Sequence, residues 1–154
     1  MKTSSFVGIK APNFSLRDQN GRVVKLQDFR GKKVILYFYV RDDTPGCTKE
    51  ACSFRDNLRK METKNVIVLG VSPDSADSHK HFADKFDLTF PLLVDEKAII
   101  AKKYGAWGRK NMYGRTYLGI VRSTFIIDEN GKVTKQYNRV RVPGHVAQLT
   151  KDID

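Results

Sequence analysis

The chain has 154 residues, which is enough to bury one sizeable core and too few for two ordinary domains, so we expect a single domain over residues 1–154. No apolar run is long enough to cross a bilayer, and residues 1–10 lack the apolar core of a secretory signal, which predicts a cytoplasmic protein with no membrane partner. The net charge of +11 is concentrated between Lys97 and Arg141, but without a basic run or a nucleic-acid motif it predicts a basic, solvated surface and no nucleic-acid partner.

The first half of the chain predicts a hairpin followed by a strand, a helix and a second strand. The run from Val34 to Val40 is β-branched and aromatic throughout, as expected for a buried central strand. The expected elements, in order, are an edge strand or extended arm at 6–16, a turn at 18–21, a strand at 23–26, one helical turn at 27–31, the central strand at 34–40, a helix at 45–62 and a strand at 66–71.

The second half continues the alternation of helices and strands. Residues 105–119 are rich in glycine and aromatic side chains and too long for a plain turn, so we mark them as a candidate functional loop. The other expected elements are a helix at 77–86, a strand at 90–94, a helix at 96–104, a hairpin of strands 123–128 and 133–137, and a short helix within 143–154. This order predicts an α/β protein of thioredoxin-like fold, a mixed sheet flanked by helices, with an N-terminal β-hairpin extension.

Both cysteines of the chain lie at the start of the helix expected at 45–62. Thr44 can cap this helix, and Pro45 suits its first position because the backbone N–H that proline lacks would be unpaired there. Cys47 then falls in the first turn, where free N–H groups and the helix dipole favour a thiolate. A lone cysteine on an apolar helix face is more often a packing residue, but threonine three positions before it favours a nucleophile.

Cys52 cannot reach Cys47 within an intact helix. Five residues of α-helix place the two Cα atoms about 8.6 Å apart, beyond the ~7 Å that a disulfide spans. A bond between Cys47 and Cys52 therefore requires the start of the helix to unwind. The alternative is that the two thiols are never linked.

Three segments together resemble the peroxiredoxins, specifically the peroxiredoxin Q or bacterioferritin comigratory protein subfamily. They are Asp42 to Asp56, which contains DDTPGCTKEAC, Gly105 to Gly108, and Arg122 to Asp128. The resemblance covers nearly the whole chain and implies a thiol-dependent peroxidase that reduces hydrogen peroxide and organic hydroperoxides. It also implies no cofactor and no metal, recycling by thioredoxin or a similar dithiol reductant, and a monomer or weak homodimer.

The same resemblance assigns roles to individual residues. Cys47 is the peroxidatic nucleophile and Cys52 the resolving cysteine that forms an intramolecular disulfide with it. Thr44 and Arg122, with backbone N–H groups near Cys47, hold the peroxide, and Glu50 orients the arginine. The chain departs from the family at Val40, four residues before the motif threonine, where proline is usual.

Other functions fit the residues less well. The spacing of the cysteines and of His79 and His81 matches no common zinc site, and a dithiol reductase would carry Cys-x-x-Cys. We expect His79, His81 and His145 to be exposed polar residues. A basic thioredoxin-fold binding module with incidental cysteines remains the competing hypothesis from another functional class.

Overall fold

The computed structural model describes residues 5–154. Its strands are β1 (Ser15–Arg17), β2 (Val23–Lys25), β3 (Lys33–Phe38), β4 (Val66–Ser72), β5 (Leu92–Val94), β6 (Trp107–Met112), β7 (Arg115–Ile120), β8 (Ser123–Ile127) and β9 (Val133–Tyr137). Its helices are α1 (Pro45–Thr63), α2 (Ala76–Phe86), α3 (Ile99–Lys103) and α4 (His145–Asp152), with short 3-10 turns η1 (Leu26–Phe29) and η2 (Glu96–Ala98). None of the helices within 5–154 is long and apolar enough to cross a membrane.

Seven strands form one mixed sheet in the order β2-β1-β5-β4-β3-β8-β9. The strands β3, β4 and β5 are parallel, whereas β8, β9 and the β1–β2 hairpin run antiparallel to their neighbours. The hairpin at 15–25 sits on the β5 edge, which confirms the predicted N-terminal extension. The predicted α/β class with helices on both faces is therefore confirmed.

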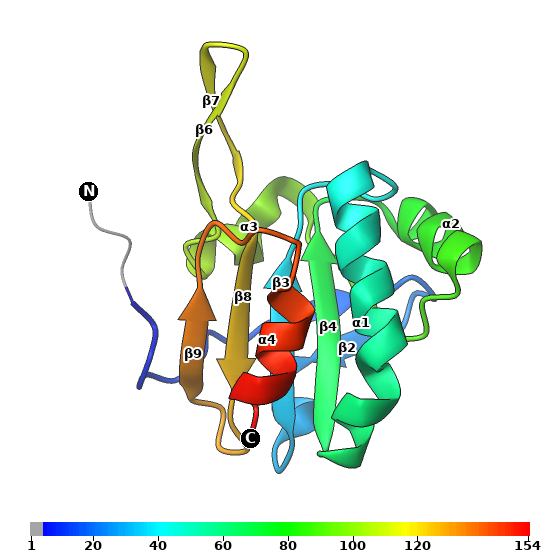
Figure 1. Ribbon diagram of the computed structural model, residues 1–154, viewed down its shortest axis with the longest axis vertical. Coiled ribbons are helices and arrows are strands. Elements are labelled where there is room, and N and C mark those ends of the chain that lie inside the picture. The colour runs from blue at the N-terminus through cyan, green and yellow to red at the C-terminus, as the bar shows by residue number, and fades with distance from the viewer. Residues whose placement is uncertain (1–4) are drawn as a thin grey trace.

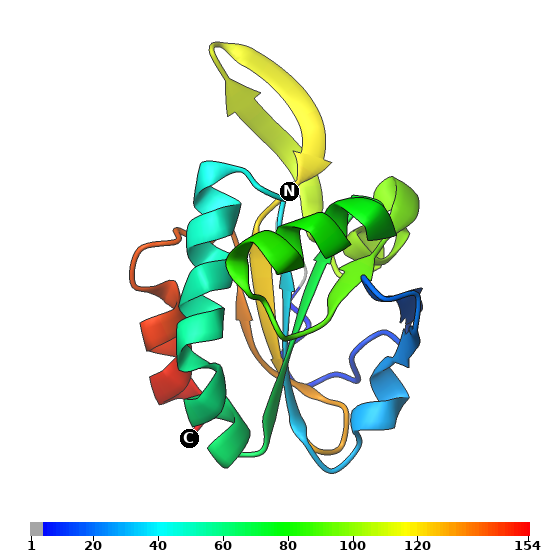
Figure 2. The ribbon, with the colours of Figure 1, turned by 90° about the vertical axis from the view of Figure 1, so that its right-hand side faces the viewer.

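The central strand β3 is buried on both faces. Ile35 and Tyr37 point into one core layer, while Leu36 and Phe38 point into the other, as strand periodicity requires. One layer is covered by α1, α2 and α4, and the other by α3 and the segment before β3. Figure 2 shows the sheet edge-on between these layers.

The carboxyl ends of β3 and β4 meet at one edge of the sheet because the two strands are parallel. The chain leaves β3 at this edge and enters α1, and β8 begins beside it. In Figure 1 this is also the end from which the β6–β7 hairpin projects. Residues that are far apart in sequence, such as Cys47 and Arg122, are thus brought to one place.

Two predicted boundaries shift in the structure. The central strand ends at Phe38, and Val40 lies on the surface. The helix expected at 96–104 is continuous only from Ile99, because Lys97 and Ala98 both adopt positive φ angles and break the chain into a 3-10 turn and a short helix.

The candidate loop at 105–119 is a β-hairpin, so our loop prediction was wrong. Strands β6 and β7 pair from Trp107 opposite Ile120 to Met112 opposite Arg115. The turn residues Tyr113 and Gly114 both have positive φ, as a two-residue hairpin turn of the primed type requires. Tyrosine is not a usual residue at such a turn, and most of the hairpin is exposed, so neither the turn signal nor a buried face marked these strands in the sequence.

The prediction that all three histidines are exposed was also wrong. His79 is fully buried, His145 is 8% exposed, and only His81 lies on the surface. His79 shares the inner face of α2 with Phe82, three residues later, so helical periodicity would have placed it inside. Burial, with the positive charge of Arg122 nearby, lowers the pKa of His145 to about 4, so that it is neutral at pH 7.

Candidate active site

The first turn of α1 is open at its N-terminus. Thr44 occupies the N-cap position, but its hydroxyl donates to the Arg41 carbonyl at 2.8 Å, and no side chain among the described residues caps the helix. The expected capping bond from Thr44 is therefore not made. The first helical bond runs from the Thr48 N–H to the Thr44 carbonyl. The N–H groups of Gly46 and Cys47, which precede Thr48, are consequently free of helical bonds.

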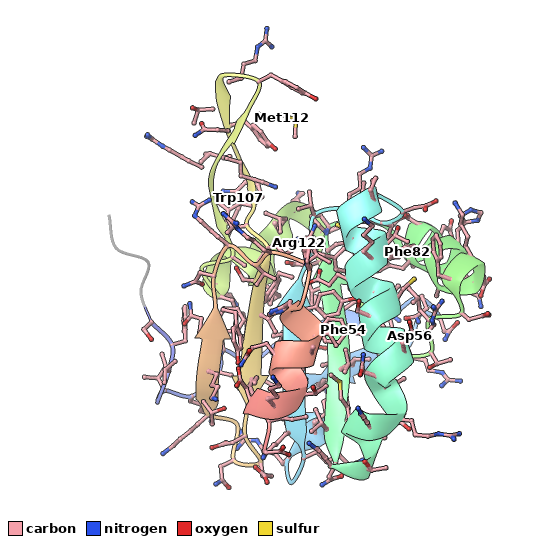
Figure 3. All side chains as sticks on the ribbon, in the orientation of Figure 1. Phe54, Asp56, Phe82, Trp107, Met112 and Arg122 are labelled. Carbon is pink, nitrogen blue, oxygen red and sulfur yellow. The ribbon has the colours of Figure 1, made fainter. Side chains whose placement is uncertain are left out.

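Cys47 lies on the inner face of α1 with 1% of its surface exposed. Its Sγ accepts a hydrogen bond from Arg122 Nη2 at 3.2 Å. Figure 3 shows Arg122 beside the beginning of α1, reaching it from the start of β8. The sulfur therefore belongs to the first turn of a helix and lies beside a guanidinium, two features typical of nucleophilic cysteines.

Glu50 holds the other side of the Arg122 guanidinium. Arg122 Nη1 donates to Glu50 Oε1 at 2.6 Å, and Glu50 is fully buried one turn after Cys47. The structure thus brings three of the predicted site residues, Cys47, Glu50 and Arg122, into one hydrogen-bonded chain. Charge-assisted bonds of this kind are short and directional, and this one ties one side of the guanidinium to α1.

A glycine allows this approach at the helix start. A Cβ at Gly46 would lie 3.3 Å from Arg122 Nη2, closer than ordinary van der Waals contact.

Val40, at the position where the family that the sequence resembles usually has proline, is 36% exposed. Cys47 is nevertheless buried, so the shielding of its sulfur does not depend on a proline at that position.

Two buried polar atoms near the site have no hydrogen-bond partner among residues 5–154, Glu50 Oε2 and the Tyr37 hydroxyl. Burial raises the pKa of Glu50 to about 7, and the attraction of Arg122 opposes this rise. Burial and the charges of Glu50 and Cys47 raise the pKa of Tyr37 well above 10, so it remains protonated. The pair of Glu50 and Arg122 therefore gains or loses a proton close to neutral pH.

This raised pKa gives a testable pH dependence of stability. Between pH 4.5, the ordinary pKa, and about 7, folded Glu50 binds more protons than unfolded Glu50, so ionisation opposes folding. Relative to Glu50→Gln, the free energy of unfolding of the wild type should fall as the pH rises through this window, by about 3 kcal/mol. Urea denaturation of both proteins at pH 5, 6, 7 and 8 measures it. A constant difference between the two proteins would contradict the assignment.

Cys52 is half-buried in the same continuous helix, and both cysteines are free thiols. Since α1 is helical from Pro45 to Thr63, the structure keeps Cys52 apart from Cys47, as the helical spacing predicts.

Lys110 is a site neighbour that sequence reasoning missed. It lies half-buried on β6, and burial together with the positive charges of Arg122 and Arg139 lowers its pKa, while Cys47 acts in the opposite direction. No sequence pattern indicates this proximity, because it arises only when the segment at 107–120 folds back as a hairpin. Lys110 therefore adds a further positive charge in the surroundings of Arg122 and Cys47.

The chain is similar to known proteins over most of its length. A family model described as AhpC/TSA family matches residues 7–136. A putative peroxiredoxin of Mycobacterium tuberculosis is 50% identical over 95% of this chain and 93% of its own length, and peroxiredoxin Bcp of Bacillus subtilis is 44% identical over 96% and 94%. Among solved structures, PrxQ of Xylella fastidiosa is 34% identical with a TM-score of 0.88, covering 99% of this chain and 95% of that one.

Proposed function

Because this chain belongs to the AhpC/TSA family and is a peroxiredoxin of the Bcp, or peroxiredoxin Q, type, we propose that its thiol peroxidase activity begins at Cys47. The Cys47 thiolate attacks the terminal oxygen of a hydroperoxide. An S–O bond forms, the O–O bond breaks, and the leaving alkoxide or hydroxide takes a proton, which leaves Cys47 as a sulfenic acid. Family membership sets aside the competing hypothesis of a binding module.

The bridging position of Arg122 is the observation that carries this proposal. A guanidinium has five N–H donors, and one bond to Cys47 and one to Glu50 leave others for the oxygens of the peroxide. The N–H groups of Gly46 and Cys47, which are free of helical bonds in the first turn of α1, supply further donors. Donors fixed before the reaction stabilise the negative charge that develops on the leaving oxygen. Thr44, whose hydroxyl lies at the helix start, completes the set of residues proposed to position the peroxide.

Cys52 is the proposed resolving residue. Its thiol attacks the sulfur of the Cys47 sulfenic acid, so that an S–S bond forms and water leaves. This step needs the first turns of α1 to unwind, because about 8.6 Å of helical separation exceeds the reach of a disulfide. A dithiol then reduces the disulfide and restores both thiols.

Replacing Cys52 with serine tests this role. Cys52→Ser should still react with one equivalent of peroxide but should lose turnover with thioredoxin by at least about 100-fold, because the sulfenic acid has no internal thiol to condense with. The measurement is thioredoxin-coupled NADPH oxidation, and mass spectrometry of the oxidised variant provides the control by showing one added oxygen on Cys47. Turnover equal to that of the wild type would remove Cys52 from the cycle.

The family implies a peroxide substrate and a thiol reductant. We further propose thioredoxin or a similar dithiol protein as the reductant, the cytoplasm as the location, and a monomer or weak homodimer without nucleic-acid or membrane partners. The pair of free thiols suits a reducing compartment. Four of the large apolar side chains exposed on the surface, Met112, Tyr113, Tyr117 and Leu118, lie on the β6–β7 hairpin, and the others lie on other segments of the chain. Sedimentation at two protein concentrations separates monomer from dimer.

A further inference from the structure

A buried polar network lies just before the active-site helix. Asp42 Oδ1 accepts a hydrogen bond from the Tyr39 hydroxyl at 2.6 Å, and Oδ2 accepts one from the Ser78 hydroxyl at 2.8 Å. His79 Nδ1 lies 2.7 Å from Asp42 Oδ2, and its Nε2 lies 2.9 Å from the Leu93 carbonyl. His79 is fully buried and Asp42 is 8% exposed, so these bonds are shielded from water.

The partners of His79 define its protonation. The Leu93 carbonyl can only accept, so Nε2 carries a proton, and a further proton must lie between Nδ1 and the Asp42 carboxylate. Such a bond is charge-assisted and stronger than the neutral bonds around it. If either Asp42 or His79 is replaced, the other side chain stays buried and loses this hydrogen bond.

The network ties the end of β3 to α2 and β5. The backbone N–H of Asp42 is also held, by Asp74 Oδ2 at 2.8 Å, and Asp74 Oδ2 in turn accepts from the Ser72 hydroxyl at 2.7 Å. Asp42, Asp74 and His79 lie close enough to hold a metal ion, but both Asp42 oxygens and both His79 nitrogens already have protein partners. We therefore assign this cluster to anchoring the chain.

Immediately after Asp42, the chain passes through one left-handed residue and enters the helix that carries both cysteines. Asp43 has a φ of 58°, in the left-handed region, and Thr44 then begins α1. Further along the helix, Phe54 is fully buried and stacks on Tyr37 with ring centroids 4.5 Å apart. In Figure 3, Phe54 lies further along α1 than the first turns, which hold the site, and is lower in the view. The segment between these two fixed points, residues 43–53, contains both cysteines.

We propose that Asp42 and His79 are positioning residues that fix the upstream end of the segment that unwinds, and so set the balance between the folded dithiol and the unwound disulfide. This proposal rests on the proposed role of Cys52. Without the anchor, unwinding extends upstream of Asp43 and the disulfide state gains conformational entropy. The equilibrium then moves toward the disulfide, and the peroxide-reactive fold of the first turn is harder to restore.

The test compares His79→Gln and Asp42→Asn with His81→Gln, a matched control at an exposed histidine of the same helix. Each protein is equilibrated with dithiothreitol redox buffers, and the Cys47–Cys52 disulfide is quantified by mass spectrometry. The anchor variants should favour the disulfide at least tenfold more than the wild type, which corresponds to a potential about 30 mV more negative. His81→Gln should match the wild type.

Hydrogen exchange of the oxidised proteins supplies a second readout. The wild type should lose protection only from about residue 43 onward, whereas the anchor variants should also lose it over residues 39–42.

Unchanged potentials in folded variants, or an equal shift in His81→Gln, would overturn the proposal. If His79→Gln fails to fold, Ser78→Ala replaces it, because this change removes one neutral donor from the same Asp42 carboxylate. Ser78→Ala should shift the disulfide potential in the same direction by a smaller amount. An unshifted potential in Ser78→Ala would overturn the proposal. A wild type that never forms the disulfide would instead contradict the role of Cys52.

Discussion

Replacing Cys47 with serine should abolish peroxidase activity, lowering kcat/KM for hydrogen peroxide by at least about 10⁴-fold. The serine oxygen is not ionised near neutral pH and cannot accept an oxygen atom and return it through a disulfide. Because Cys47 is buried against Ala51 and Phe54, the smaller oxygen should leave the fold intact. The measurement is initial rates with thioredoxin or dithiothreitol as reductant.

The control for this variant is its stability. Circular dichroism and the midpoint of urea denaturation should stay close to those of the wild type, so that the loss of rate is chemical. Residual activity above about 0.01% would mean that another group attacks the peroxide, since a removed nucleophile leaves only the effect of the binding groups.

Replacing Arg122 with glutamine should have the next largest effect, a loss of about 10²–10³-fold in kcat/KM. Arg122 is the group that contacts both the Cys47 sulfur and Glu50, so its loss removes a donor to the thiolate and to the peroxide together. The same change removes the attraction that opposes the rise in the Glu50 pKa, so Glu50 becomes neutral at pH 7 and its buried carboxyl loses a hydrogen-bond donor, which should lower the free energy of unfolding by about 1–3 kcal/mol. Peroxide kinetics and urea denaturation measure the two effects separately.

A double variant separates chemistry from stability. In Arg122→Gln with Glu50→Gln, the buried carboxyl is replaced by an amide that has both a donor and an acceptor for the glutamine at position 122, so stability should recover while activity remains low. Recovery of activity along with stability would show that Arg122 acts only as a structural partner of Glu50.

The elements with a strong local pattern could be predicted from the sequence. The central strand around Val34 to Phe38 is apolar on both faces, and the helix starting at Pro45 carries its own start signal and apolar face. Their order also predicts the parallel pairing of β3 with β4, because a crossover helix lies between the strands. The position of Cys47 at a helix start followed from these local rules.

The parts of the site that could not be predicted from local sequence depend on contacts that only the folded chain makes. Arg122 precedes β8, and nothing in its local sequence places it against a sulfur 75 residues earlier; only the family resemblance pointed to it. The capping role expected for Thr44 failed because its hydroxyl finds the Arg41 carbonyl instead. Lys110 reaches the site through a hairpin whose exposed strands leave no apolar alternation in the sequence.

His79 shows a different limit of sequence reasoning. Its spacing from Phe82 places it on the inner face of α2, but histidine is intermediate between the buried and the exposed residue types, so its type alone does not indicate burial. Its burial is explained by two distant partners, Asp42 and the Leu93 carbonyl, which pair with the two ring nitrogens.

The most direct test of the central claim is to mix the reduced wild-type protein with one equivalent of hydrogen peroxide and follow both thiols by rapid quenching and mass spectrometry. Cys47 should be oxidised at least about 10³-fold faster than free cysteine, because its thiolate and the donors around it are held in place. The first stable product should be the Cys47–Cys52 disulfide. If Cys47 is still reduced when free cysteine has reacted, or if the oxidation resides on another side chain, the account of this site is contradicted.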